Sequence, residues 1–388
     1  MRSMFLAFIS IFLSVYGLIN FYVFIRGFQA IAQGSTLRAV YAIAFWIVAL
    51  CFWGGRYLEN AWPSGFSQFL VWVGSFWIAA MFYFFFAVVL LDLLRLINRF
   101  FPFLPEFIAG NYGRAKATAA IVVIALVAAT LLGGYINSLF PRIRTLDLVI
   151  QKSAGDMKNI NIVAASDIHL GTIVGRERFN RMVDKINGLH PDVVLFSGDI
   201  VDEDLAPVVR QNLGETLRSI TPRFGVFAVT GNHEYIGGVE QACAYLSEHN
   251  VVMLRDRAIK VNNSFFLIGR EDASSRRFAN RERKTLAELM AGVDKTYPVV
   301  LLDHQPVQLA GSVREGVDLQ LSGHTHNGQL WPFNYVVKAL FEVACGYKKL
   351  GKTHVYVSLG VGTWGPPVRI GHRPEIVHIR LRIESPEH

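Results

Sequence analysis

Four long stretches of the chain contain no charged residue, although 18% of all its residues are charged. Each stretch is apolar and is close to or above the roughly 20 residues that a helix needs to cross the hydrocarbon core of a membrane. The absence of charge therefore predicts four membrane-spanning helices and excludes an ordinary soluble chain. We expect these helices at about residues 3–25, 39–55, 66–91 and 117–139. The first stretch lacks a small-residue cleavage site, which favours a retained anchor over a signal peptide.

Cysteine is also scarce, with three residues in 388. Cys51 lies in a predicted span, and Cys243 shares the apolar face of a predicted helix with Val239 and Leu246. Three cysteines in these positions exclude a disulfide framework and favour packing in a core.

Asp92, at the end of the third predicted span, is the one charge that we assign to the spans. No path for ions or protons is visible, which argues against transport. The loops on one side of the four spans carry six basic residues, and those on the other side carry five. Four of the six lie in the third loop, which favours a cytoplasmic location for that loop and an outward-facing C-terminal domain.

From about residue 160 the chain changes to short apolar runs separated by Gly, Asp, Asn and charged residues, a pattern typical of a soluble α/β domain. Residues 142–159 are polar and mixed in charge, which predicts a linker. We therefore expect a transmembrane domain at residues 1–141, a linker at 142–159 and an α/β domain at 160–388.

Five apolar runs in the C-terminal part each end in polar residues, and the runs read as buried strands. Residues with helical apolar spacing, such as Phe179, Met182 and Ile186, lie between the first two runs and predict a βαβ crossover. Ligands bind beyond the carboxyl ends of such strands, so five polar clusters meet at one edge. The runs with their clusters are residues 161–169, 193–199, 226–233, 299–304 and 317–326.

The polar clusters contain Asp, His and Asn, which suit Mn, Fe, Zn or Mg better than a thiolate site would. Asp167 and His169 are two residues apart and can reach one ion, and His324 and His326 repeat this spacing. Two metals a few ångströms apart need a shared ligand, and a carboxylate with two oxygens provides one. Asp199 is the candidate for this bridging ligand.

Five ordered motifs in this part resemble those of the calcineurin-like metallophosphoesterases. They are Asp-Ile-His (167–169), Gly-Asp-x-x-Asp (198–202), Gly-Asn-His-Glu (231–234), His304 and Gly-His-Thr-His (323–326). The segments 323–329 and 360–369 further resemble the bacterial YkuE-like, membrane-anchored branch. The resemblance implies an αββα sandwich domain after the four-helix transmembrane domain, two divalent metal ions, and hydrolysis of phosphoester or phosphoanhydride bonds.

The resemblance also implies individual roles. Asp167, His169 and His326 hold one metal with Asp199, and Asn232, His304 and His324 hold the second, again with Asp199. A hydroxide between the metals attacks phosphorus, and His233 protonates or stabilises the leaving oxygen while Asp202 orients its ring. Protein phosphatases of this superfamily carry Arg and Gly after the second Asp of the Gly-Asp-x-x-Asp motif. Glu203 and Asp204 occupy those positions here, which disfavours a protein substrate.

Three further features leave alternatives open. The basic residues between Arg276 and Lys284 begin a solvated helix or contact an anionic substrate or lipid headgroups. The apolar segment 330–344 is a core helix or an apolar lip that meets membrane or an acyl chain. Arg369 is a surface residue or a substrate-binding phosphate contact.

The leading hypothesis is a membrane-anchored, dinuclear metallophosphoesterase acting on a lipid-linked or headgroup phosphate. The alternatives are a phosphodiesterase acting on a soluble nucleotide, and a membrane protein that binds metal without catalysis. We expect an integral protein of the bacterial cytoplasmic membrane, with phosphorylated membrane lipid as its partner. No nucleic acid is expected, because basic and aromatic residues are not interleaved.

Overall fold

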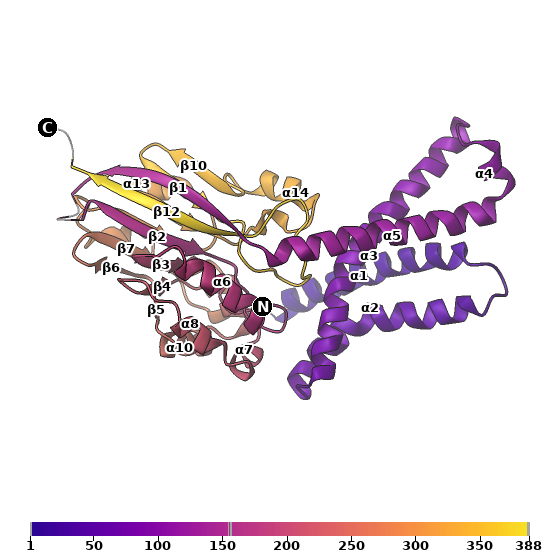
Figure 1. Cartoon of the computed structure of the whole chain (residues 1–388), viewed down its shortest axis with the longest axis horizontal. Helices are drawn as coiled ribbons and strands as arrows, with labels where there is room; N and C mark the ends of the chain where they lie inside the picture. Colours follow the sequence, from indigo (N-terminus) through magenta and orange to yellow (C-terminus); the bar gives the residue numbers. More distant parts are fainter. Residues whose placement is uncertain (1, 154, 156, 386–388) are drawn as a thin grey trace. The chain divides into compact units, whose positions relative to one another are not determined.

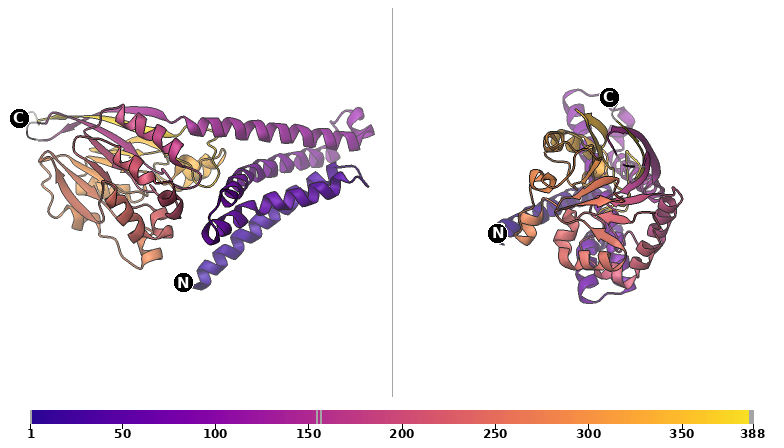
Figure 2. Two further views of the ribbon diagram at one scale, coloured as in Figure 1. Left: turned by 60° about the horizontal axis from the view of Figure 1, so that its bottom comes forward. Right: turned by 90° about the vertical axis from the view of Figure 1, so that its left-hand side faces the viewer.

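The computed structural model describes residues 2–153, 155 and 157–385. The chain forms two compact units. The helical unit comprises Met1–Tyr135 with Gly365–Val368, and the α/β unit comprises Ile136–Trp364 with Arg369–His388. In Figures 1 and 2 most of the helical unit is indigo to purple, and the α/β unit runs from magenta to yellow.

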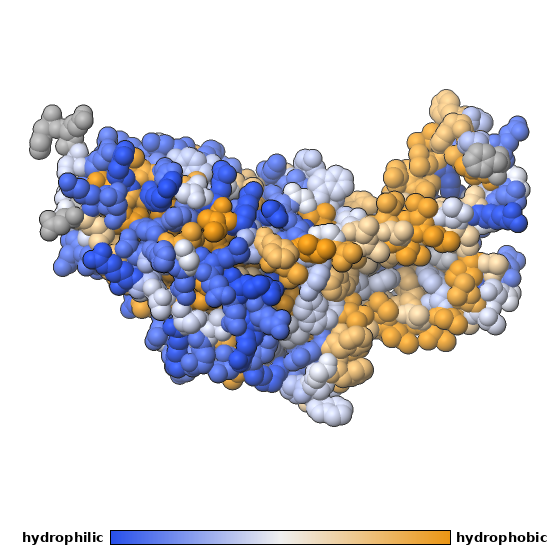
Figure 3. Space-filling model, viewed as in Figure 1, coloured by the Kyte–Doolittle hydropathy of each residue, from blue (hydrophilic) through white to orange (hydrophobic). Residues whose placement is uncertain are grey.

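The helical unit contains four helices that are long and apolar enough to cross a membrane, as predicted. They are α1 (Arg2–Ala30), α2 (Leu37–Ala61), α3 (Gly65–Phe100) and α5 (Tyr112–Leu139), with the short α4 (Glu106–Gly110) between the last two. Figure 3 shows apolar side chains over the surface of these helices. α3 has 36 residues, about 54 Å, so its basic end extends past a hydrocarbon core of about 30 Å.

Close backbone approach and one buried polar network hold the helical unit together. A side chain at Gly74 of α3 would collide with the backbone of Phe52 in α2, so these helices pack at a small residue. Asn20 is fully buried; its side-chain nitrogen donates to the carbonyl oxygen of Tyr16, and its oxygen accepts from the indole of Trp77, both at 2.9 Å. These bonds satisfy the amide in an apolar environment.

The α/β unit contains two six-stranded sheets. The first has the order β1 (Arg142–Gln151), β12 (Glu375–Glu384), β2 (Asn159–Ala165), β3 (Val193–Phe196), β4 (Val226–Ala228), β5 (Val251–Met253). The second has the order β10 (Gly346–Leu350), β11 (Thr353–Val357), β9 (Leu319–Ser322), β8 (Val299–Leu302), β7 (Phe265–Gly269), β6 (Arg257–Val261). Strands β2 to β5 are parallel, as are β7, β8, β9 and β11.

The two sheets pack face to face, and helices cover their outer faces. Ile162 and Leu195 of the first sheet share one buried cluster with Val300 and Leu321 of the second. The other face of the first sheet packs against α6 (Arg176–Asn187), α8 (Leu213–Arg218) and α10 (Val239–Glu248). The second sheet packs against α12 (Leu286–Met290). The predicted αββα sandwich is confirmed, and Figure 1 shows the two layers of strands.

The predicted linker is wrong for residues 142–151. This segment forms β1, which pairs in parallel with β12 over ten residues. Leu148 and Ile150 are 5% exposed in the core between the sheets, whereas Val149 between them is 38% exposed. The mixed charge that suggested a linker belongs to the outward face of a strand with alternating burial. Its partner lies some 230 residues later, so the pairing is not visible in the local sequence.

Because β1 belongs to the core, Leu148→Ala and Ile150→Ala should each cost about 2–5 kcal/mol of unfolding free energy. Val149→Ala, on the outward face, should change it by less than about 0.5 kcal/mol. Thermal unfolding of the full chain in detergent measures the difference. Equal effects of all three substitutions would show that β1 contributes nothing to the core.

Candidate metal centre

The predicted ligands lie at the carboxyl ends of five strands drawn from both sheets. Asp167 and His169 follow β2, and Asp199 follows β3. Asn232 and His233 begin α9 (Asn232–Gly237) after β4. His304 follows β8, and His324 and His326 follow β9, the last of them in the 3-10 turn η1 (His326–Gly328). The sheets therefore converge at one edge, and no single sheet holds the site.

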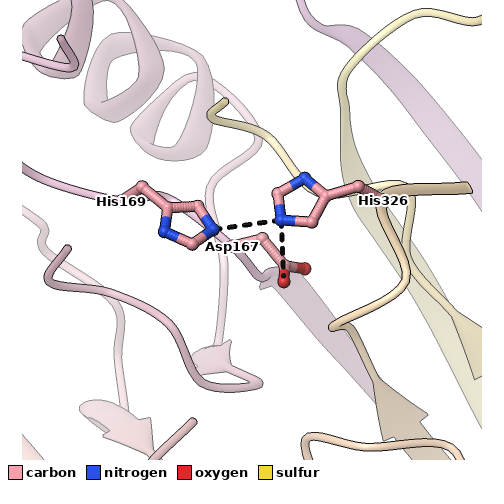
Figure 4. A group of neighbouring side chains, drawn as sticks. All are labelled: Asp167, His169 and His326. Carbon is pink, nitrogen blue, oxygen red and sulfur yellow. Dashed lines mark hydrogen bonds and ion pairs between the residues drawn. The ribbon is translucent and has the colours of Figure 1, made fainter. Parts of the chain in front are cut away.

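The first group of side chains is Asp167, His169 and His326, whose ligand atoms lie within 4.8 Å of one another. The two imidazole Nε2 atoms are 3.0 Å apart, and Nε2 of His326 lies 3.4 Å from Oδ1 of Asp167 (Figure 4). All three residues are buried. Two nitrogens and a carboxylate oxygen that face one another in this way fit a divalent metal of borderline character.

The second group surrounds Asp199 and Asn232. Nε2 of His304 lies 3.1 Å from Oδ2 of Asp199 and 3.3 Å from Oδ1 of Asn232. Nδ1 of His324 lies 2.8 Å from the same amide oxygen. Nδ1 of His304 donates to the carbonyl oxygen of Ser197 at 2.7 Å, so the lone pair of this ring is on Nε2, which faces the ligands. This set also fits a divalent metal.

The backbone is strained where the site is formed. Five of the predicted ligands have positive φ angles between 45° and 72°, a region that residues other than glycine seldom occupy. Such strain persists only where surrounding structure imposes it, and it gathers at functional sites. The five are Asp167, His169, Asp199, His324 and His326.

The backbone approaches the ligands closely at Gly231 and Gly323. A side chain at Gly231 would collide with the carboxylate of Asp199, and one at Gly323 would collide with that of Asp167. Both positions therefore need a residue without a Cβ atom.

Glu234 organises the loop that carries Asp199, a role that the sequence analysis missed. Its buried carboxylate accepts hydrogen bonds from the backbone amides of Asp199, Ile200, Val201 and Gly231, at 2.7 to 3.1 Å. Two strand ends are thereby tied together beneath the site. Glu234 is the last residue of the Gly-Asn-His-Glu motif, which marks it as a residue of the site. The motif alone does not show that its carboxylate binds backbone amides.

His233 lies beside the two groups and faces carboxylates. Its Nδ1 is 3.3 Å from Oδ1 of Asp202 and 3.8 Å from Glu203. Burial disfavours the charged ring, but the carboxylates of Asp199 and Asp202 outweigh burial and raise the pKa of His233 to about 9. Proximity alone also groups His233 with His169 and Asp199.

Comparison with known proteins agrees with this geometry. The profile of the calcineurin-like phosphoesterase family matches residues 160–328. An uncharacterized metallophosphoesterase of Aquifex aeolicus is 33% identical over 259 residues, which are 66% of this chain and 97% of that protein. The chain belongs to the calcineurin-like metallophosphoesterases.

Two further relatives refine this placement. A transmembrane protein with metallophosphoesterase domain from Danio rerio is 31% identical over 301 residues, 74% of this chain and 68% of that protein. The uncharacterized metallophosphoesterase YkuE of Bacillus subtilis is 28% identical over 270 residues, 64% of this chain and 89% of that protein. The predicted family is confirmed, and this metallophosphoesterase is a phosphoester hydrolase and an integral membrane protein.

Arg369 does not lie where a substrate-binding residue would. The side chain is fully buried, and its guanidinium donates to the backbone carbonyl oxygens of Gly362, Leu359 and His326 and lies 3.0 Å from Nδ1 of the His326 ring. Burial lowers the pKa of Arg369 to about 10, which leaves it charged at neutral pH. Burial and this guanidinium hold the pKa of His326 well below its usual range. Arg369 thus supports the backbone of His326 with its donors turned inward, a position that does not fit the expected phosphate contact.

Arg369→Lys in this metallophosphoesterase should therefore weaken metal binding about 10- to 100-fold, because an ammonium cannot reproduce the fork that holds His326. Metal affinity of the purified chain, measured by calorimetry, checks this. Arg373→Lys is the control, since Arg373 is exposed and makes a 3.3 Å bond to Asn137. Unchanged metal affinity with a raised KM would restore the phosphate-contact role.

Proposed function

We propose that this metallophosphoesterase hydrolyses the phosphate ester or pyrophosphate of a lipid or lipid-linked substrate at a membrane surface. The observation that supports this most directly is an apolar rim beside the metal centre. The rim includes three exposed side chains of α14 (Phe333–Leu340), which are Tyr335, Val336 and Leu340. It also includes Trp331, just before this helix, and Trp364, beside the metal centre. Each of the five side chains is 50% to 72% exposed.

The rim adjoins two histidines of the site. The Trp364 ring lies 5.5 Å from that of His233, and the ring of Phe341, directly after α14, lies 6.0 Å from that of His324. No residue of α14 is buried, so the core-helix alternative for this segment does not hold. Exposed apolar surface of this kind beside a polar site suits a substrate with both a phosphate and a hydrocarbon part.

The basic residues near Arg276 contribute less to this proposal. Arg283 donates to the buried carboxylate of Asp303 at 3.0 Å, and Arg281 lies 3.7 Å from Glu271. Arg276 pairs with Glu282 at 3.5 Å at the surface. These residues serve mainly within the fold, which leaves substrate recognition to the rim and the metal centre.

In the proposed mechanism Asp167, His169 and His326 would hold one metal, Asn232, His304 and His324 would hold the other, and Asp199 would contribute to both. Two divalent metals would supply Lewis acidity toward the phosphoryl oxygens and would lower the pKa of water. His233, protonated at neutral pH, donates its proton to the leaving oxygen. The Asp202 carboxylate lies 3.3 Å from Nδ1 of His233, which favours a proton on that nitrogen and leaves the opposite ring nitrogen for the substrate.

The membrane segment supports the choice of substrate. Two residues, Phe140 and Pro141, separate α5 from β1, so the hydrolase is tethered to the membrane by a short connection. The proposal includes a bacterial cytoplasmic membrane with the α/β unit on its outer side, as the loop charges favour.

His233→Gln should lower kcat about 10²- to 10⁴-fold while the metal content stays unchanged, because the proton donor is lost and the ligands remain. Asp199→Asn should lose both metal and activity. Hydrolysis of an aryl phosphate by the detergent-solubilised chain with Mn²⁺, beside its metal analysis, tests both. Loss of metal from His233→Gln would instead make this residue a ligand. If no phosphate ester is cleaved although metal is bound, the noncatalytic alternative gains.

Tyr335→Ser and Leu340→Ser should raise KM for a lipid phosphate about tenfold or more and leave hydrolysis of a water-soluble aryl phosphate unchanged. Val252→Ser, an exposed apolar position on β5, is the matched control. Kinetics in mixed micelles with lipid monoesters, diesters and pyrophosphates provide the measurement. Equal effects on lipid and soluble substrates would contradict a lipid-binding rim, and preference for a nucleotide diester would favour the soluble-substrate alternative.

A further inference from the structure

The helical unit contains a cavity of about 510 Å³ that the metal centre does not use. Residues of α1, α2, α3, α4 and α5 line it, and most of its wall is apolar, with Phe45, Trp77, Val88 and Val123 among them. From Trp77 to Asp92 the wall follows α3 for about 22 Å, more than the roughly 15 Å of one leaflet's hydrocarbon. A fatty acyl chain therefore fits along it.

One end of the cavity carries charge from three helices. Arg26 of α1, Asp92 and Arg95 of α3, and Lys116 of α5 all line this end. Arg26 and Arg95 share the single carboxylate of Asp92, at 2.6 Å and 3.3 Å, and the hydroxyl of Tyr22 also donates to it.

Arg26 also donates to the amide oxygen of Gln29 at 3.1 Å, and the other two cations contact an aromatic ring. Arg95 and Lys116 both lie over the ring of Tyr112, at 5.4 Å and 5.3 Å from its centroid. Three cations thus meet one anion, an excess of two positive charges at the mouth of an apolar cavity. Arg26 and Arg95 are 33% and 48% exposed at the side chain, so an anionic group can reach them.

We infer that this cavity is a binding site for a membrane phospholipid with a net negative headgroup. The acyl chains lie against the apolar wall, and the headgroup phosphate meets the basic cluster of Arg26, Arg95 and Lys116. Charged residues at membrane helices are costly and mark binding sites, and basic pockets between such helices bind acidic lipid headgroups. The site is independent of the proposed hydrolysis, because it shares no residue with the metal centre.

Native mass spectrometry of the full chain in detergent tests the site, with titration of phosphatidylglycerol and phosphatidylcholine that carry the same acyl chains. The anionic lipid should bind about tenfold more tightly or better. The combined change Arg26→Gln, Arg95→Gln and Lys116→Gln should abolish this preference. The matched control changes Arg38, Arg99 and Arg114 to Gln, which are basic residues of the same loops and helix ends outside the cavity lining, and should keep it.

Asp92→Asn provides a test in the opposite direction, and this test remains valid if the triple variant misfolds. Removing Asp92, the one carboxylate among the described residues that line the cavity, should strengthen binding of phosphatidylglycerol severalfold and leave phosphatidylcholine unchanged. Equal affinity of the native chain for the two lipids would overturn the proposal. So would an equal loss in the control triple variant, because binding would then depend on general basicity and not on the cavity.

Discussion

The buried carboxylate of Asp199 carries a negative charge that neighbouring groups must stabilise, and much of the metal centre is arranged to do so. Burial raises the cost of its charge, but His304, His233 and His169 outweigh this and keep the pKa of Asp199 well below its usual range. Its Oδ1 accepts from the backbone amide of His233 at 2.9 Å, and its own amide donates to Glu234. Three strand ends are joined through this one residue, so its position fixes the distance between the two groups of ligands.

The second level of organisation lies behind the ligands. Glu234 binds four backbone amides below Asp199, the Ser197 carbonyl oxygen fixes the tautomer of His304, and Arg369 donates to the backbone carbonyl oxygen of His326. Such partners keep ligand atoms directed at a common point despite the strained backbone that presents them. Arg369 does not contact the substrate in this arrangement, because the donor groups of its guanidinium face backbone carbonyl oxygens inside the fold.

The two units pose opposite problems of solvation. In the α/β unit apolar surface is placed in the core, and the exposed rim on α14 is the exception that points to a ligand with hydrocarbon. In the helical unit apolar surface faces outward by necessity, and the exception is the basic cluster around Asp92. Both exceptions favour a lipid with a phosphate, one as substrate and the other as a resident of the membrane segment.

The sequence by itself determined the four spans, the strands that end in polar clusters and the set of ligand candidates, because apolar run length, strand pattern and short motifs are local properties. It did not determine that β1 belongs to the sheet, since its partner β12 lies at the other end of the chain. Nor did it show that Arg369 is buried against His326, that Glu234 holds four amides, or that α14 has no buried residue. These depend on contacts between residues far apart in sequence, and burial is a property of the packed chain that only the tertiary structure decides.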